Sequence, residues 1–278
     1  MLGLFKRIAT HGHAPYHHHG AVLLTVCESY KPMTLVEFEF AEQALESVAD
    51  WLYPGKSSQP YCLGTHFVLS DHQAQPLQNE LSARLGNGQL PVVLTNAHET
   101  VLHVLPLISH ARVETGIVSI GNDFQLKQSL EPQLGSAYHF ALARFSESRL
   151  FSLGIDPSRQ KETMLEYAED QGCNWMTNEE CNFRHRFQLK NLLGGYIGHC
   201  DQLIIDIDLE SLLPKNGVDS HQHLNVQMVL RMIRQCMMSG KVKYVQLVGC
   251  KDKHIYSRAT KLILDNLATM MPSRPVAA

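Results

Sequence analysis

Apolar and polar positions along the chain alternate in a way that predicts strands separated by helices. Short runs rich in Val, Ile and Leu predict buried strands at 91–94, 116–120, 149–155, 202–208 and 243–248. Helical spacing lies between most of these runs, and the clearest helices are expected at 160–171, 224–239 and 255–271. Strands that alternate with helices are typical of βαβ units and a parallel sheet.

The first ninety residues have a less regular pattern. The run at 21–27 predicts a strand, and the alternation at 35–40 predicts a second one. Residues 42–51 have helical spacing, 65–70 indicate a further strand, and 73–86 have helix-like apolar positions. Because there is no internal repeat or low-complexity linker, we expect one domain over residues 1–278, a three-layer α/β/α unit with a mostly parallel sheet.

Composition is that of an ordinary soluble protein. Hydrophobic residues make up 44% of the 278 residues and charged residues only 18%, which favours a substantial core. The formal charge of -3 gives no electrostatic support for nucleic acid or an anionic membrane as partner. No apolar run approaches the ~20 residues of a membrane-spanning helix. The N-terminus has no signal-peptide core, so a cytoplasmic location is the default expectation.

Cysteine and histidine are distributed unevenly. The seven cysteines form no C-x-x-C pair, and their odd number favours reduced thiols. Sixteen histidines are many for this length, and five of them fall within 11–19. This His-rich start, residues 1–20, could bind a transition metal adventitiously. No cysteine or carboxylate interleaves to fix a ligand geometry, which favours a flexible or peripheral terminus instead.

The most informative stretch is the predicted strand at 202–208, which ends in Asp206 and Asp208. Side chains two apart on a strand point to the same side, here at the edge where a parallel sheet meets its loops. Two such carboxylates are costly to bury unless a cation, a basic side chain or a proton compensates them.

Two other predicted strands also end in candidate ligands. His98 follows the strand at 91–94, and Asp123 follows the strand at 116–120. One histidine and three aspartates from three strand ends could bind a divalent ion such as Mn²⁺ or Zn²⁺. The alternative is that His98 bonds the following helix and the aspartates only solvate loops. Residue types alone leave both interpretations open.

The order of these pieces resembles the ureohydrolase family of arginase, agmatinase and especially formimidoylglutamase. The family has Gly-Gly-(Gly/Asp)-His, then Asp-Ala-His-x-Asp, then Asp-x-Asp. This chain has Thr-Asn-Ala-His-Glu-Thr at 95–100, Gly-Asn-Asp-Phe-Gln-Leu at 121–126 and Asp-Ile-Asp-Leu at 206–209. The resemblance covers roughly 89–271 and implies the arginase-like α/β fold.

The resemblance also implies a metal centre. In the family these motifs hold two manganese ions that share a bridging hydroxide. His98 would then ligate the first ion, Asp208 the second, and Asp206 both.

The middle motif departs from the family pattern. Gly121 and Gln125 replace two aspartates, and Asp123 replaces a histidine. Glycine has no side chain to offer, and a glutamine amide is a weak ligand for a transition metal. The resemblance therefore predicts one divalent ion at most, preferably manganese, on His98, Asp123, Asp206 and Asp208.

The substrate side departs from the family as well. Gly249 stands where the family has an acidic residue that holds the cationic amidine. The loop at 134–138 retains only a glycine and a hydroxyl side chain of the corresponding family motif. Two functions stay open. The first is a metal-dependent hydrolase of a C–N bond in a small amidine or guanidino compound, such as formimidoylglutamate, with an impaired or single-metal centre. The second is a non-catalytic arginase-like protein with a binding or structural role. Homo-oligomers are common in the family, so the resemblance makes one possible here.

Overall fold

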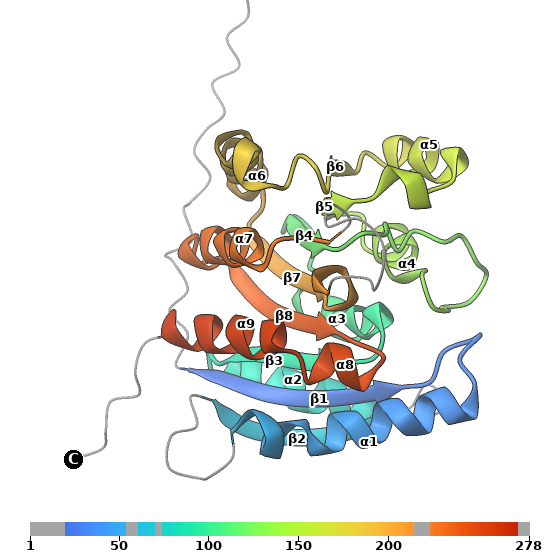
Figure 1. Cartoon of the computed structure of the whole chain (residues 1–278), viewed down its shortest axis with the longest axis vertical. Coiled ribbons are helices and arrows are strands. Elements are labelled where there is room, and N and C mark those ends of the chain that lie inside the picture. Colours follow the sequence, from blue (N-terminus) through green and yellow to red (C-terminus); the bar gives the residue numbers. More distant parts are fainter. Residues whose placement is uncertain (1–19, 54–60, 70–73, 214–222, 272–278) are drawn as a thin grey trace, which may run out of the picture.

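A single parallel sheet of eight strands forms the middle of the molecule (Figure 1). The computed structural model describes residues 20–53, 61–69, 74–213 and 223–271, so nearly all of the His-rich start lies outside the described residues. The strand order is β2-β1-β3-β8-β7-β4-β5-β6. The strands are β1 (Ala21–Glu28), β2 (Cys62–Leu69), β3 (Leu90–Thr95), β4 (Thr115–Ile120), β5 (Ser148–Ile155), β6 (Asn174–Thr177), β7 (Gln202–Asp208) and β8 (Val242–Val248).

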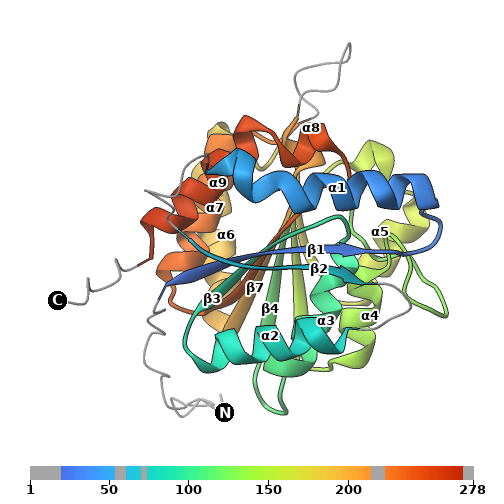
Figure 2. The same ribbon diagram turned by 90° about the horizontal axis from the view of Figure 1, so that it is seen from below.

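Helices cover both faces of this sheet (Figure 2). One layer contains α1 (Leu35–Leu52), α6 (Arg186–His199), α7 (Val226–Met238) and α9 (Arg258–Thr269). The other contains α2 (Gln75–Gly86), α3 (Val101–Ile108), α4 (Ala137–Arg144) and α5 (Glu162–Asp170). The predicted three-layer α/β/α class is therefore confirmed.

The central strands are apolar because both of their faces are covered. On β1, Val22 and Leu24 pack towards the layer of α2 and α3, whereas Leu23 and Cys27 pack towards the layer of α1. All six residues of β4 are buried, and so are the first six residues of β7. Asp208, the last residue of β7, is the first that is partly exposed. The core therefore ends where the candidate ligands begin.

The strand predicted at 35–40 is wrong, because these residues form the first turns of α1. Thr34 and Glu37 make a capping box, in which each side chain bonds the other residue's backbone N–H and starts the helix. Leu35, Val36 and Phe40 are 70%, 59% and 64% exposed. The alternation of apolar residues therefore does not correspond to a buried face of a strand.

The helix predicted at 255–271 matches α9 (Arg258–Thr269) within a few residues. The short α8 (Asp252–Ile255) ends before Ser257, whose hydroxyl accepts a hydrogen bond from the Thr260 N–H and caps α9. The helix predicted at 42–51 is the later part of α1, which begins at Leu35. The other predicted strands and helices match described elements within a few residues, although residues 70 and 73 of the predicted ranges lie outside the described residues. No helix in the described ranges is long and apolar enough to cross a membrane.

Candidate functional site

Three strands, β3, β7 and β4, bring the candidate ligands to one edge of the sheet. The order β3-β8-β7-β4 places the end of each strand beside the next. His98 begins the short 3-10 helix η1 (His98–Thr100) after β3, and Asp206 and Asp208 lie at the end of β7. This carboxyl edge is where open parallel sheets usually bind ligands.

Asp206 is the centre of a buried hydrogen-bond network. Its side chain is fully buried, and its Oδ2 accepts hydrogen bonds from the Tyr138 hydroxyl, from Gln246 Nε2 at 3.0 Å and from His98 Nδ1 at 2.9 Å. Gln246 Nε2 also lies 3.1 Å from the backbone oxygen of His98, and the Tyr244 hydroxyl donates to Gln246 Oε1 at 3.1 Å. Three donors therefore converge on one carboxylate oxygen.

Electrostatics keep these donors protonated. Burial lowers the pKa of His98, but the Asp206 carboxylate, helped by Asp208 and Glu99, outweighs it and raises that pKa to about 9. Burial, together with the charge of Asp206, raises the pKa of the Tyr138 hydroxyl well above its ordinary value. At neutral pH a protonated imidazole, a phenol and an amide thus compensate Asp206. The protein's own side chains therefore compensate the negative charge of Asp206.

The other oxygen of Asp206 is different. Within the described part of the chain no group donates to Oδ1, although this atom is buried. Asp208 follows on the same side of β7, and burial raises the pKa of its carboxyl to about 6 despite the charge of His98. A buried oxygen without a donor and a carboxylate that is costly to ionise both fit a cation.

Two glycines near this edge leave little space for a larger side chain. A Cβ at Gly121 would lie 2.9 Å from Cβ of Asp208, closer than real Cβ atoms approach. A Cβ at Gly249 would meet Cβ of His254 at 3.1 Å and Cδ1 of Leu209 at 3.2 Å. A side chain at Gly121 therefore has no room beside Asp208, and one at Gly249 would be crowded.

Asp123 is engaged elsewhere. Its Oδ1 accepts a hydrogen bond from Gln160 Nε2 at 2.8 Å, and its Oδ2 lies 3.2 Å from Arg159 Nη2. Both partners lie in and after the short 3-10 helix η2 (Pro157–Arg159) that follows β5. The structure thus joins His98 to Asp206 and places Asp208 on the same strand, while Asp123 is paired away from them. Its role as a ligand stays a prediction.

Sequence reasoning missed Tyr138 and Gln246. Tyr138 belongs to α4, which the apolar pattern did not predict. The sequence does contain an indication of Gln246, because it is a polar residue inside the apolar run of β8. It pairs in register with Asp206 on β7, so an amide and a carboxylate are direct neighbours.

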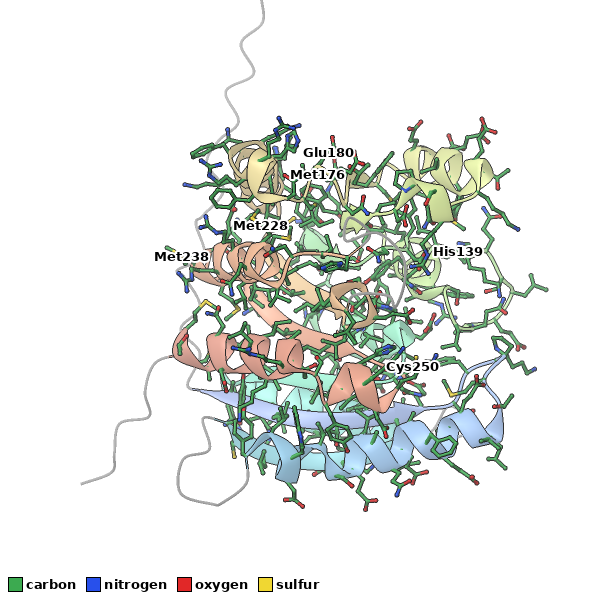
Figure 3. The ribbon with its side chains drawn as sticks, viewed as in Figure 1. His139, Met176, Glu180, Met228, Met238 and Cys250 are labelled. Carbon is green, nitrogen blue, oxygen red and sulfur yellow. The ribbon has the colours of Figure 1, made fainter. Side chains whose placement is uncertain are left out.

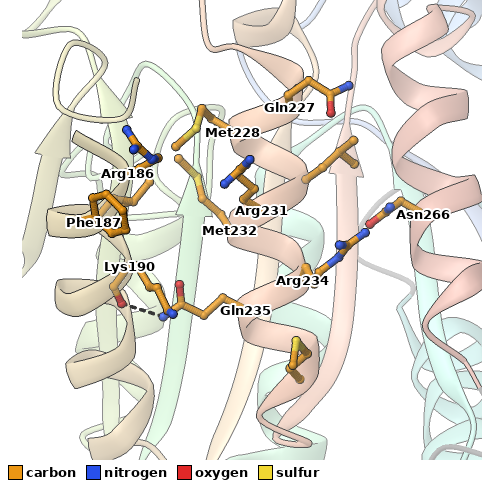
Figure 4. Close-up of a pocket in the computed structure, with 13 residues that line it drawn as sticks. Arg186, Phe187, Lys190, Gln227, Met228, Arg231, Met232, Arg234, Gln235 and Asn266 are labelled. Carbon is orange, nitrogen blue, oxygen red and sulfur yellow. Dashed lines mark hydrogen bonds between the residues drawn. The ribbon is translucent and has the colours of Figure 1, made fainter. Parts of the chain in front are cut away.

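A groove of the described structure lies away from this edge. It has a volume of about 810 Å³ and runs between α6, α7 and α9, with Arg186, Lys190, Arg231 and Arg234 among its lining residues (Figure 4). These residues belong to the outer helical layer, and the groove includes none of the candidate ligands. The chemistry therefore points to the carboxyl edge of the sheet.

An eight-stranded parallel sheet between two helical layers, with Asp-x-Asp at the end of a central strand, is the arginase-like α/β fold. Solved structures agree. Formimidoylglutamase from Bacillus subtilis subsp. subtilis str. 168 superposes with a TM-score of 0.68 at 16% identity, over 92% of this chain and 88% of that one. Arginase from Bacillus subtilis gives a TM-score of 0.69 at 11% identity, over 90% and 98%.

Sequence comparison gives a related result. No family model matches the chain. A curated formimidoylglutamase from Rhodococcus opacus (strain B4) is 23% identical over 182 residues, which cover 61% of this chain. The match spans 57% of the length of that relative. These similarities confirm the resemblance to the ureohydrolases that the motifs indicate.

Proposed function

We propose that this chain hydrolyses a C–N bond in a small amidine or guanidino compound, with one divalent ion instead of two. Formimidoylglutamate is the first substrate to test, because both a curated relative and a similar solved structure are formimidoylglutamases. The observation that carries the single-ion proposal is Oδ1 of Asp206, which is buried and receives no hydrogen bond from the described residues. Asp208 adds a second carboxylate, partly exposed, on the same side of the strand.

The ligand set for this ion is the one predicted from the sequence, with manganese as the metal. Asp206 and Asp208 would hold the ion, and Asp123 would join them after leaving Arg159 and Gln160. His98 would bind only as the neutral imidazole, so the ion must displace the proton that the raised pKa of His98 retains at neutral pH. When bound, such an ion lowers the pKa of a water molecule and supplies hydroxide near neutral pH.

The protein's own residues orient this site. Tyr138, Gln246 and His98 all bond Oδ2 of Asp206, so the carboxylate is fixed with its other oxygen available to a cation. Gly249 provides no carboxylate for a cationic amidine, which removes one attraction that the family uses. We therefore expect turnover to be slow on the family's usual substrates.

A non-catalytic binding role is the second candidate function. It is favoured by the same network, because three donors already compensate Asp206. The ion pair of Asp123 with Arg159 and the closed space at Gly121 favour it too. In this role the pair of His98 and Asp206 would stabilise the edge of the sheet only.

The two candidates are separated by manganese binding and turnover in the full chain. Release of formamide, urea or ammonia is measured with formimidoylglutamate, arginine and agmatine. The hydrolase predicts manganese-dependent release that is lost in Asp208→Asn and kept in Asp170→Asn, an exposed aspartate at the end of α5. Binding of an amidine without product supports the second candidate. If neither manganese nor an amidine binds, both proposals fail.

A further inference from the structure

Three side chains of different chemistry meet beside the candidate site. Glu210 opens the short 3-10 helix η4 (Glu210–Leu212) after β7, Cys250 follows β8, and His254 lies in α8. One ligand atom of each residue lies within 4.8 Å of the others. In the part of the chain that the structure describes, this is the one such group of three or more His, Cys, Asp and Glu ligand atoms. Cys250 lies next to α8 (Figure 3).

His254 provides a second, independent observation. The residue is 2% exposed, yet its ring Nδ1 has no hydrogen-bond partner among the described residues. A buried polar atom without a partner is costly, and an ion or a water molecule bound to that atom would remove the cost.

We propose that Glu210, Cys250 and His254 form a binding site for a Zn²⁺ ion. A thiolate, an imidazole and a carboxylate are the three ligand types that zinc takes in proteins. Three protein ligands leave a fourth position for water or a small ligand. Cys250 also lines a pocket of about 580 Å³ with Met33, Phe40 and Leu134, so there is room beside the cluster for such a ligand.

This site is distinct from the one proposed for manganese. The backbone N–H of Glu210 donates to Oδ1 of Asp208, so the two sites are neighbours, but no side chain belongs to both. Thiolate ligands select zinc, whereas carboxylates suit manganese. Zinc binding at Cys250 therefore does not depend on amidine hydrolysis.

Cobalt is the probe that tests this site, because Co²⁺ replaces zinc and gives a sulfur-to-metal absorption band only when a thiolate binds it. We expect the reduced, metal-free full chain to show this band with one Co²⁺, and we expect Zn²⁺ to abolish it. The His-rich start contains no cysteine and cannot produce the band. Cys250→Ser should remove the band, and Cys62→Ser, which changes a half-buried thiol on β2, should keep it.

The remaining variants keep the test decisive. Glu210→Gln and His254→Gln should each weaken zinc binding at least tenfold in a chelator competition. Glu210 is partly exposed, so its variant should fold even if the buried His254 variant does not. Asp208→Asn should keep the band whatever happens to turnover. The proposal is overturned if wild type shows no band with cobalt, or if the band survives in Cys250→Ser.

Discussion

Replacing Tyr138 by Phe removes one of the three donors to Asp206, together with the hydrogen bond between the same hydroxyl and Ser119. The phenol is fully buried in α4 and its hydroxyl donates to Oδ2 of Asp206. Water cannot easily take its place at a site without exposure. The variant therefore measures how much the carboxylate depends on the protein's own donors.

The expected cost follows from the charge of the acceptor. A hydrogen bond to a charged group contributes about 1.5–3 kcal/mol, against about 1 kcal/mol for a neutral pair. Tyr61 is a matched control, because it is 3% exposed and its hydroxyl donates to the neutral backbone oxygen of Leu264 at 2.6 Å. We expect Tyr138→Phe to lower the free energy of unfolding by about 2–3 kcal/mol and Tyr61→Phe by about 1 kcal/mol.

Urea unfolding of both variants and of wild type, followed by circular dichroism, gives these free energies. The comparison is made without added metal and again with manganese. If an ion binds Asp206, manganese should reduce the cost of Tyr138→Phe and leave that of Tyr61→Phe unchanged. A cost for Tyr138→Phe no larger than that for Tyr61→Phe would refute the role given to the phenol.

Three further predictions concern packing, charge and pH. Gly121→Ala should destabilise the fold by about 1–3 kcal/mol because its Cβ would crowd Asp208. Gly195→Ala on α6 should stabilise the fold by about 0.5–1 kcal/mol, because the added Cβ would meet no described atom within 4 Å apart from its chain neighbours and the backbone of its own helix. Urea unfolding should show these opposite signs. Asp123→Asn should weaken manganese binding less than Asp208→Asn in calorimetric titration, because the Asp123 carboxylate is already paired with Arg159; an equal loss would contradict this pairing. Burial raises the pKa of four core thiols above the ordinary value of 9.0, to about 11 for Cys200 and to about 12 for the other three. Above pH 9 the unfolded chain therefore loses protons that the folded chain keeps, and the free energy of unfolding decreases as the pH rises. At pH 10, ionisation of each thiol in the unfolded chain should lower the free energy of unfolding by about 1.4 kcal/mol. Urea unfolding under reducing conditions measures the sum, and a total decrease of less than about 1 kcal/mol would contradict the burial of these thiols. The four are Cys27, Cys181, Cys200 and Cys236.

The sheet and its edge were predictable because parallel strands are apolar on both faces. The run at 202–208 matches β7, and its two aspartates lie at the carboxyl edge as expected. The misassigned segment at 35–40 had a local signal against it, since Thr34 and Glu37 have the spacing of a capping box. Exposed Leu35 and Phe40 produced the misleading alternation.

The partners of Asp206 were harder to predict, since they come from distant parts of the chain. Tyr138 and Gln246 reach Asp206 only because α4 packs on the sheet and β8 pairs with β7. The closed space at Gly121 also depends on how closely β4 approaches Asp208. Such distances depend on how the helices and strands pack together, and this packing cannot be deduced from residue types and their spacing.

The number of manganese ions per chain tests the central claim most directly. It is measured by elemental analysis of a full-length variant in which the five histidines within 11–19 are replaced by Gln and Cys250 by Ser. With these changes, manganese bound by the N-terminal histidines or at the Cys250 site does not add to the measured number of ions. The proposed hydrolase predicts one manganese ion per chain, lost in Asp208→Asn. Two ions per chain, or none at saturating manganese, would contradict it.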